Sequence, residues 1–216
     1  MAGLLDWLNS TAAHLWGVDV SWAEVLGDLT GLAAVWWAAR EKVWTWPVGN
    51  LNSALFLVLF LDAKLYASSV LQVVFIALGF FGWWEWVRRH GPDRRPLVVS
   101  RATPLQWVGI GVAGSAVLVS WTWWLAAHTD SPQPFWDSAI LAVSLVATYG
   151  QARKLLESWW LWILVDVISV PLYLSRGLVP TAAVYAIFGV LCVMGLREWR
   201  AELRSTTTLD PAQAVA

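Results

Sequence analysis

The sequence has little of several residue types on which other classes of protein depend. Its 216 residues include one cysteine, Cys192, which excludes an intrachain disulfide and a cysteine-ligated metal cluster. Only 13% of the residues are charged, whereas a soluble domain has about 25%. The net charge of −1 gives no basis for binding nucleic acid. With 58% hydrophobic residues in long apolar runs, the sequence predicts a polytopic membrane protein.

Signatures of catalysis are missing as well. Neither H-E-x-x-H nor G-x-S-x-G occurs, and His14, His90 and His128 fall at segment ends and in loops rather than in a cluster. No G-x-x-x-x-G-K-[ST] loop occurs, so any use of ATP would need another chain. We therefore expect neither an enzyme nor a bound metal or other cofactor. A carboxylate pair of Asp28 with Asp166 is the remaining enzymatic alternative, and a subunit of a larger transporter is the remaining structural one.

Seven apolar segments are each close to the ~20 residues that a bilayer requires. We expect residues 1–21 to be an interfacial or extracellular segment that forms an amphipathic surface helix. We expect 88–104 to be a cytoplasmic loop and 200–216 a flexible cytoplasmic tail. The seven predicted spans are 22–39, 46–63, 66–87, 105–126, 135–152, 159–175 and 178–197.

The basic residues predict how these spans are oriented. With seven spans, all of the 14 lysines and arginines except Lys64 and Arg176 fall on one side. The positive-inside rule then places the N-terminus outside and the C-terminus in the cytoplasm.

The chain also contains an internal repeat. "LYASSVLQVVFIALGFFGWWEW" (65–86) aligns without gaps to "LVPTAAVYAIFGVLCVMGLREW" (178–199). Upstream, a shift of three residues pairs Trp46 with Trp162 and Asn50 with Asp166. We therefore predict two three-helix repeats, 22–87 and 135–199, joined by the linking helix 105–126. This is the parallel-repeat plan, in which the substrate binds near the midplane between the repeats.

Polar residues inside these spans indicate where a solute binds, because membrane-depth polar groups face an interior or a cavity. Asp166 is the strongest candidate, since it lies mid-span and Pro171 loosens the helix after it. Hydrogen bonding between helices is the alternative for Asn52 and Gln151, and the favoured interpretation for Asp28.

Aromatic and amide side chains accompany these polar positions. The stretch "WTWPVGNLN" (44–52) combines tryptophan faces with amides that donate and accept, and 159–173 offers a similar set. Most of the 19 tryptophans fit the membrane interface. Together these groups suit a planar, polar, uncharged or weakly cationic solute.

Three motifs carry a resemblance to a known family: "WTWPVGNLN", "LYASSVLQVVFIALGFFGWWEW" and "ESWWLWILVDVISVPLYLSRGL". In this order they resemble the PnuC family of bacterial vitamin transporters, over about residues 25–200. The resemblance implies an all-α membrane protein with seven helices in a 3+1+3, SWEET-like arrangement. It implies facilitated diffusion of a vitamin across the bacterial cytoplasmic membrane, trapping by a cytoplasmic kinase, and often a trimer. The substrate contacts that we expect are Trp46, Asn50, Asn52, Gln72, Trp159, Trp162, Asp166 and Tyr173.

The resemblance leaves the vitamin open between nicotinamide riboside, riboflavin and thiamine. "GNLN" is more similar to the nicotinamide riboside group, whereas members of that group often have Asn where this chain has Asp166. An aspartate favours a cationic ring, which nicotinamide riboside and thiamine both have. We expect nicotinamide riboside, with riboflavin or thiamine as the alternative.

Overall fold

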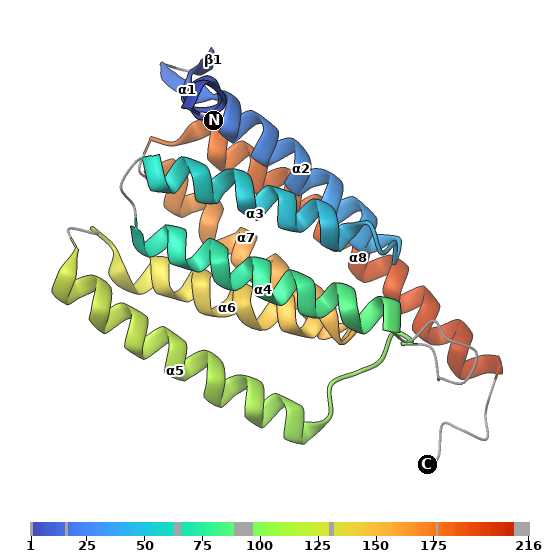
Figure 1. The fold of residues 1–216 in the computed structure, drawn as a ribbon. Coiled ribbons are helices and arrows are strands. Elements are labelled where there is room, and N and C mark those ends of the chain that lie inside the picture. The colour runs from blue at the N-terminus through green and yellow to red at the C-terminus, as the bar shows by residue number, and fades with distance from the viewer. Residues whose placement is uncertain are drawn as a thin grey trace.

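The structure is a bundle of helices with a short β-hairpin near its N-terminus (Figure 1). The computed structural model describes residues 2–15, 17–62, 66–88, 97–129, 132–175 and 177–209. In these residues, strands β1 (Thr11–Leu15) and β2 (Val18–Ser21) pair antiparallel. The helices are α1 (Ala2–Asn9), α2 (Trp22–Ala39), α3 (Thr45–Asp62), α4 (Tyr66–Arg88), α5 (Pro104–His128), α6 (Pro134–Ala152), α7 (Glu157–Ser175) and α8 (Val179–Leu209).

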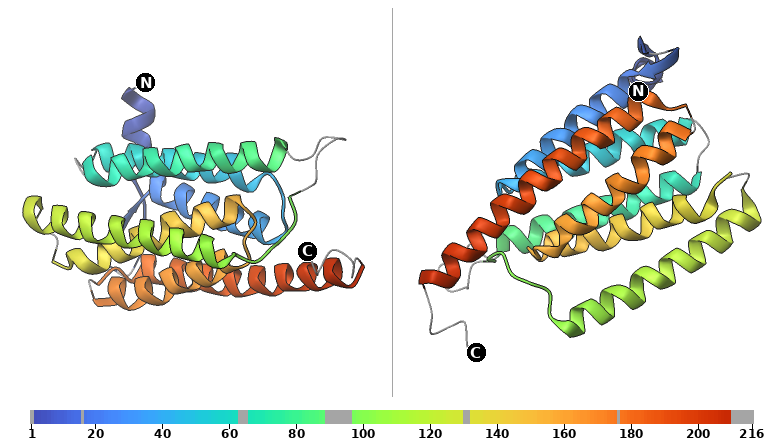
Figure 2. Two further views of the ribbon diagram at one scale, coloured as in Figure 1. Left: turned by 90° about the horizontal axis from the view of Figure 1, so that it is seen from below. Right: turned by 180° about the vertical axis from the view of Figure 1, so that it is seen from behind.

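The helices form two groups of three. Helices α2, α3 and α4 pack in sequence, as do α6, α7 and α8. The groups meet along two seams, where α2 contacts α8 and α4 contacts α6. Helix α5 packs against α6 at the outer edge of the bundle and has no buried residue (Figure 2).

The apolar helices confirm a multi-pass membrane protein. Four of the described helices are long and apolar enough to span a bilayer: α4, α5, α7 and α8; α3 is a shorter apolar helix. Helix α2 has spanning length but carries Glu24 and Asp28. Six of the seven predicted spans agree with a helix to within two residues at each end.

Both ends of the chain differ from the prediction. Helix α8 continues to Leu209, so the expected flexible tail is wrong for 200–209; residues 210–216 lie outside the described residues. At the N-terminus, the expected surface helix ends at Asn9 and a hairpin follows. The hairpin leads into α2 through a capping box, in which Ser21 and Glu24 each bond the other's backbone N–H.

Two turns show how closely the halves correspond. Glu41, between α2 and α3, and Lys154, between α6 and α7, are 113 residues apart and have φ of 54° and 52°. The N–H of Glu41 donates to the carbonyl of Ala38, and that of Lys154 donates to the carbonyl of Gln151. The same offset therefore holds in the structure as in the aligned segments. We call the end of the bundle that carries these turns the turn end.

The described segment before α5, residues 97–103, is bonded to the α6–α7 turn. The N–H of Ser100 donates to the carbonyl of Lys154 (3.1 Å), and the N–H of Leu156 donates back to the carbonyl of Ser100 (2.9 Å). The N–H of Ala102 donates to the carboxylate of Glu157 (2.9 Å). The segment 97–103 is thus fixed to the α6–α7 turn; residues 89–96 of the predicted loop lie outside the described part.

Four tryptophans at the turn end join the two groups of helices. The indole N–H of Trp86 on α4 donates to the carbonyls of Gln151 and Ala152 on α6 (3.3 and 3.2 Å). The indole N–H of Trp199 on α8 donates to the carbonyls of Ala38 and Ala39 on α2 (3.2 and 3.1 Å). Each repeat thus satisfies carbonyls at the end of the other repeat's first helix, where the helix itself supplies no partner. With Trp46 and Trp159 they form the tryptophan cluster.

Candidate functional site

Trp46 and Trp159, two predicted substrate contacts, lie inside the tryptophan cluster. They are 6% and 1% exposed, and their rings meet Trp86 and Trp199 edge-on at centroid distances of 5.5 Å. Trp46 therefore corresponds to Trp159 across the repeat, and the sequence-based pairing with Trp162 is wrong. Their role as substrate contacts stays a prediction.

Glycines make room for these two rings. A Cβ added at Gly82 on α4 would overlap the ring of Trp46, and one at Gly195 on α8 would overlap that of Trp159. Each indole N–H is buried without a hydrogen-bond partner. Buried donors are nearly always paired, so both rings retain unused hydrogen-bonding capacity beside the predicted site.

One face of α7 carries the predicted site residues of the second repeat. Spacings of three and four residues place side chains on the same side of a helix. The residues with this spacing are Trp159, Trp162, Asp166, Ser169 and Tyr173. The face therefore runs from the tryptophan cluster at the turn end to the opposite end of α7, with Asp166 at its centre.

Asp166 is buried against α8. Its side chain is 6% exposed and lies 3.6 Å from where a Cβ would stand on Gly189. One carboxylate oxygen, Oδ2, has no hydrogen-bond partner. Among the described residues, no lysine or arginine forms an ion pair with it. A carboxylate so placed attracts a cation or a hydrogen-bond donor.

The two asparagines of α3 have different surroundings. The Asn52 amide donates to the carbonyl of Gly27 and, at 3.5 Å, to the Thr30 hydroxyl, so it joins α3 to α2. The Asn50 side chain lies against Gly79 on α4, and its Nδ2 is buried without a partner. At the 113-residue offset of the two turns, Asn50 corresponds to Ile163 and not to Asp166, so the helix register does not reproduce the sequence-based pairing of Asn50 with Asp166.

The remaining predicted residues lie on α4 and α7. Gln72 is half-buried on α4. The Trp162 indole N–H donates to the side-chain oxygen of Gln151 at 2.7 Å. The ring of Tyr173 packs against that of Tyr185 on α8, at a centroid distance of 5.1 Å.

Sequence reasoning missed Tyr185. Its ring packs against Tyr173 at a centroid distance of 5.1 Å and meets Phe188 edge-on at 5.8 Å. Tyr185 occupies the position equivalent to Gln72, so the aligned repeat contained the signal that could have found it.

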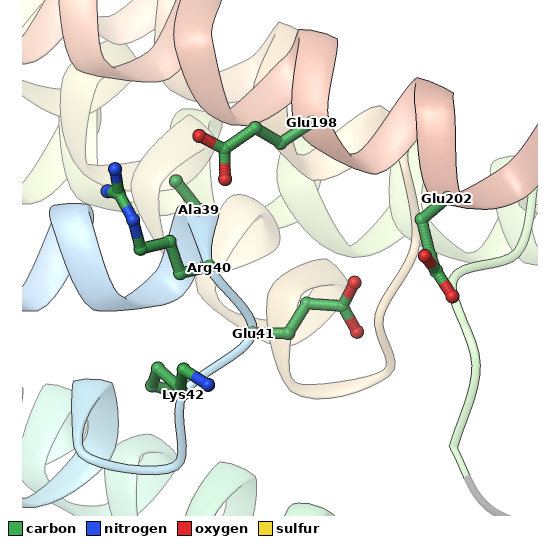
Figure 3. Close-up of a pocket in the computed structure, with 6 residues that line it drawn as sticks. All are labelled: Ala39, Arg40, Glu41, Lys42, Glu198 and Glu202. Carbon is green, nitrogen blue, oxygen red and sulfur yellow. The ribbon is translucent and has the colours of Figure 1, made fainter.

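The surface hollow drawn in Figure 3 is separate from this site. It lies at the turn end between the α2–α3 turn and α8, and mixes basic and acidic side chains. Its lining residues are Ala39, Arg40, Glu41, Lys42, Glu198 and Glu202. Among the described residues, no three histidines, cysteines or carboxylates gather as metal ligands would.

Comparison with known proteins identifies a single family. The model of a family described as nicotinamide mononucleotide transporter matches residues 21–201. The chain is 32% identical to the riboflavin/roseoflavin transporter RibM of Streptomyces davaonensis, over 97% of this chain and 100% of that protein. It is 30% identical to the nicotinamide riboside transporter PnuC of Escherichia coli, over 85% of this chain and 87% of that protein.

A solved structure shares the fold. The crystal structure of a vitamin B3 transporter PnuC aligns with a TM-score of 0.69 and 20% sequence identity. The alignment covers 85% of this chain and 83% of that one.

Proposed function

The chain belongs to the nicotinamide mononucleotide transporter family, and from this premise we propose that it carries nicotinamide riboside by facilitated diffusion. The resemblance to PnuC noted in the sequence is thereby confirmed, and the protein is a membrane transporter of a vitamin. Family and fold indicate a transporter rather than an enzyme. The vitamin itself and the way in which it moves are the proposal.

The observation that carries the proposal is the state of Asp166. Its carboxylate is buried and has a free oxygen and no basic partner among the described residues. Nicotinamide riboside is a planar pyridinium cation linked to a sugar. A positive ring beside Asp166 would neutralise a buried charge, and the Trp162 face would stack on it.

The proposed binding site lies between the two groups of helices. Asp166, Trp162 and Tyr173 contribute from α7, and Asn50 and Gln72 from α3 and α4. Trp46 and Trp159 would bound the site at the turn end, and Asn52 would hold α3 against α2 beside it. Asn50 and Asp166 each have a buried polar atom without a hydrogen-bond partner, which supports a site to which both repeats contribute.

We propose that seven helices, α2 to α8, span the membrane in a 3+1+3, SWEET-like arrangement. The shared offset of the turns and of the tryptophan cluster supports two parallel repeats, with α5 as the extra span. The distribution of lysine and arginine supports an external N-terminus and a cytoplasmic C-terminus. The turn end would then face the cytoplasm.

Two partners belong to the proposal. A cytoplasmic kinase would phosphorylate the imported vitamin and so keep its gradient directed inward. A homotrimer is the assembly that the PnuC resemblance implies, and α5, which has no buried residue within the described chain, offers an outer face for such contacts.

Riboflavin is the second candidate. The observation that favours it is the alignment to the riboflavin/roseoflavin transporter, which covers 97% of this chain at 32% identity. A riboflavin carrier of the same fold would use the same aromatic faces. It would not need the charge of Asp166, because riboflavin is neutral.

A binding titration distinguishes these candidates. Nicotinamide riboside, riboflavin and thiamine are each titrated into the purified protein, and affinity is measured by calorimetry or by quenching of tryptophan fluorescence. Selective binding of nicotinamide riboside is the expected result. Selective binding of riboflavin or thiamine would replace the substrate, and binding of none of them would overturn the proposal.

A further inference from the structure

Gln151 connects a residue of the proposed site to the tryptophan cluster. It lies in the last turn of α6 and is 8% exposed. Its side-chain oxygen accepts the hydrogen bond from the Trp162 indole at 2.7 Å, and its backbone carbonyl accepts one from Trp86 at 3.3 Å. An indole N–H only donates, so the amide oxygen is the atom that faces Trp162.

This connection exists in only one of the two repeats. Ala38 stands at the position equivalent to Gln151, and Gly49 at the position equivalent to Trp162. Neither residue has a side chain that could form the bond. A Cβ placed on Gly49 would have no atom within 4 Å, so nothing packs there as the indole does on α7. The bond is therefore a feature of the second repeat and not a requirement of the helix pair.

The geometry points to Gln151 as a positioning residue for the vitamin: its amide fixes the orientation of the Trp162 ring that stacks on the substrate. This inference rests on the proposed function and extends it to a residue that does not itself touch the vitamin. The bond engages the edge of the indole, at Nε1, and not its faces. A ring held at its edge presents one constant face, so less side-chain freedom is lost when the substrate binds.

Two further hydrogen bonds hold the backbone of Gln151 in place. Its carbonyl is held by Trp86 of the other helix group, and Trp86 is 1% exposed. The N–H of Lys154 also donates to the same carbonyl at 3.0 Å. The amide is therefore presented from a fixed point where α4 and α6 meet, in the last turn of α6.

A double-mutant cycle tests the inference. Gln151→Met keeps the length of the side chain but removes the acceptor, and Trp162→Phe removes the donor. A net hydrogen bond of ordinary strength corresponds to a ~2–10-fold change in affinity. Each single variant should weaken binding of nicotinamide riboside by about this factor or more, and Gln151→Met should add no further loss in the Trp162→Phe background. Gln151→Glu, which retains an acceptor oxygen, should recover part of the affinity.

Two further readouts separate positioning from general loss of structure. The indole ¹⁵N–¹H resonance of Trp162, assigned by its absence in Trp162→Phe, should shift in Gln151→Met without any ligand and return toward its position in Gln151→Glu. The matched control is Gln106→Met in the capping box of α5, which should leave both affinity and this resonance unchanged.

Failure of the proposed function can be distinguished from failure of the role assigned to Gln151. A wild-type protein that binds none of the three vitamins would overturn the proposed function and the role of Gln151 with it. A wild-type protein that binds nicotinamide riboside or riboflavin, beside a Gln151→Met variant of equal affinity and an unshifted resonance, would overturn the role of Gln151 alone. Losses of affinity that add up in the double variant would also overturn the role of Gln151.

Discussion

Glu41 and Lys154 occupy the same position in the two repeats and form an ion pair with each other. Each lies in the turn after the first helix of its group, in the left-handed backbone region. Lys154 is 9% exposed and Glu41 25%. Because the turns belong to different groups of helices, the pair holds the two groups together at the turn end.

Removing the carboxylate from this pair should destabilise the protein. In Glu41→Gln the buried Lys154 ammonium loses its charged partner, and we expect a cost of about 1–3 kcal/mol, measured as a lower midpoint of thermal unfolding in detergent. The exchanged pair, Glu41→Lys with Lys154→Glu, should recover most of this loss. If Glu41→Gln melts like the wild type, the ion pair is not stabilising.

Asp166→Asn should discriminate between the candidate vitamins. The substitution keeps the shape of the side chain and removes its charge, so we expect binding of nicotinamide riboside to weaken ~10-fold or more, or about 1.4 kcal/mol, while riboflavin is unaffected. Calorimetric titration of both vitamins into the variant measures this difference. An equal loss for both would mean that Asp166 acts through hydrogen bonding rather than charge.

Gly82→Ala and Gly195→Ala should each destabilise the tryptophan cluster. The added methyl group would overlap the ring of Trp46 or Trp159. Overpacking of this kind costs about 1–3 kcal/mol, seen as a lower unfolding temperature. Gly109→Ala on α5 is the matched control, because a Cβ there meets nothing within 4 Å and alanine favours a helix. Equal stability of all three variants would contradict the close packing of these rings.

Substitutions of the two asparagines of α3 should have different effects, one on stability and the other on binding of the vitamin. Asn52→Ala removes the hydrogen bond to the Gly27 carbonyl and should lower the unfolding temperature, with a cost of about 1 kcal/mol. Asn50→Ala removes a buried amide nitrogen that has no partner, so stability should change little while affinity for the vitamin falls. Thermal unfolding and titration of both variants provide the comparison. If Asn50→Ala instead lowers the unfolding temperature and Asn52→Ala lowers the affinity, the roles of the two asparagines are exchanged.

The sequence predicted the helices well because their signal is local. Apolar runs bounded by polar residues set six of the seven spans to within two residues. The end of α8 was missed because polarity alone suggested disorder. Residues 200–209 can nevertheless continue a helix, since none of them is proline or glycine. The hairpin at 11–21 was missed because the apolar residues before it were assigned to one longer helix.

The site was harder to predict because it depends on which faces of the helices contact one another. Aligned segments alone could not decide whether Trp46 matches Trp159 or Trp162, as both are tryptophans on the same face of α7. Their contacts decide it, since only Trp159 meets Trp199 as Trp46 meets Trp86. Tyr185 was overlooked because a tyrosine in an apolar helix is unremarkable until its ring is found against Tyr173 of the predicted site.

Because Ser100 is bonded to the α6–α7 turn, helix α5 belongs with α6, α7 and α8, and the two groups of helices differ in size. Helix α5 packs on α6, and the segment before it is bonded to Lys154, Leu156 and Glu157. Any rocking of one group of helices against the other therefore carries α5 with α6, α7 and α8, while α2, α3 and α4 move as a smaller body. If α5 also contacts neighbouring copies, the second repeat stays fixed in the membrane and the first repeat moves against it.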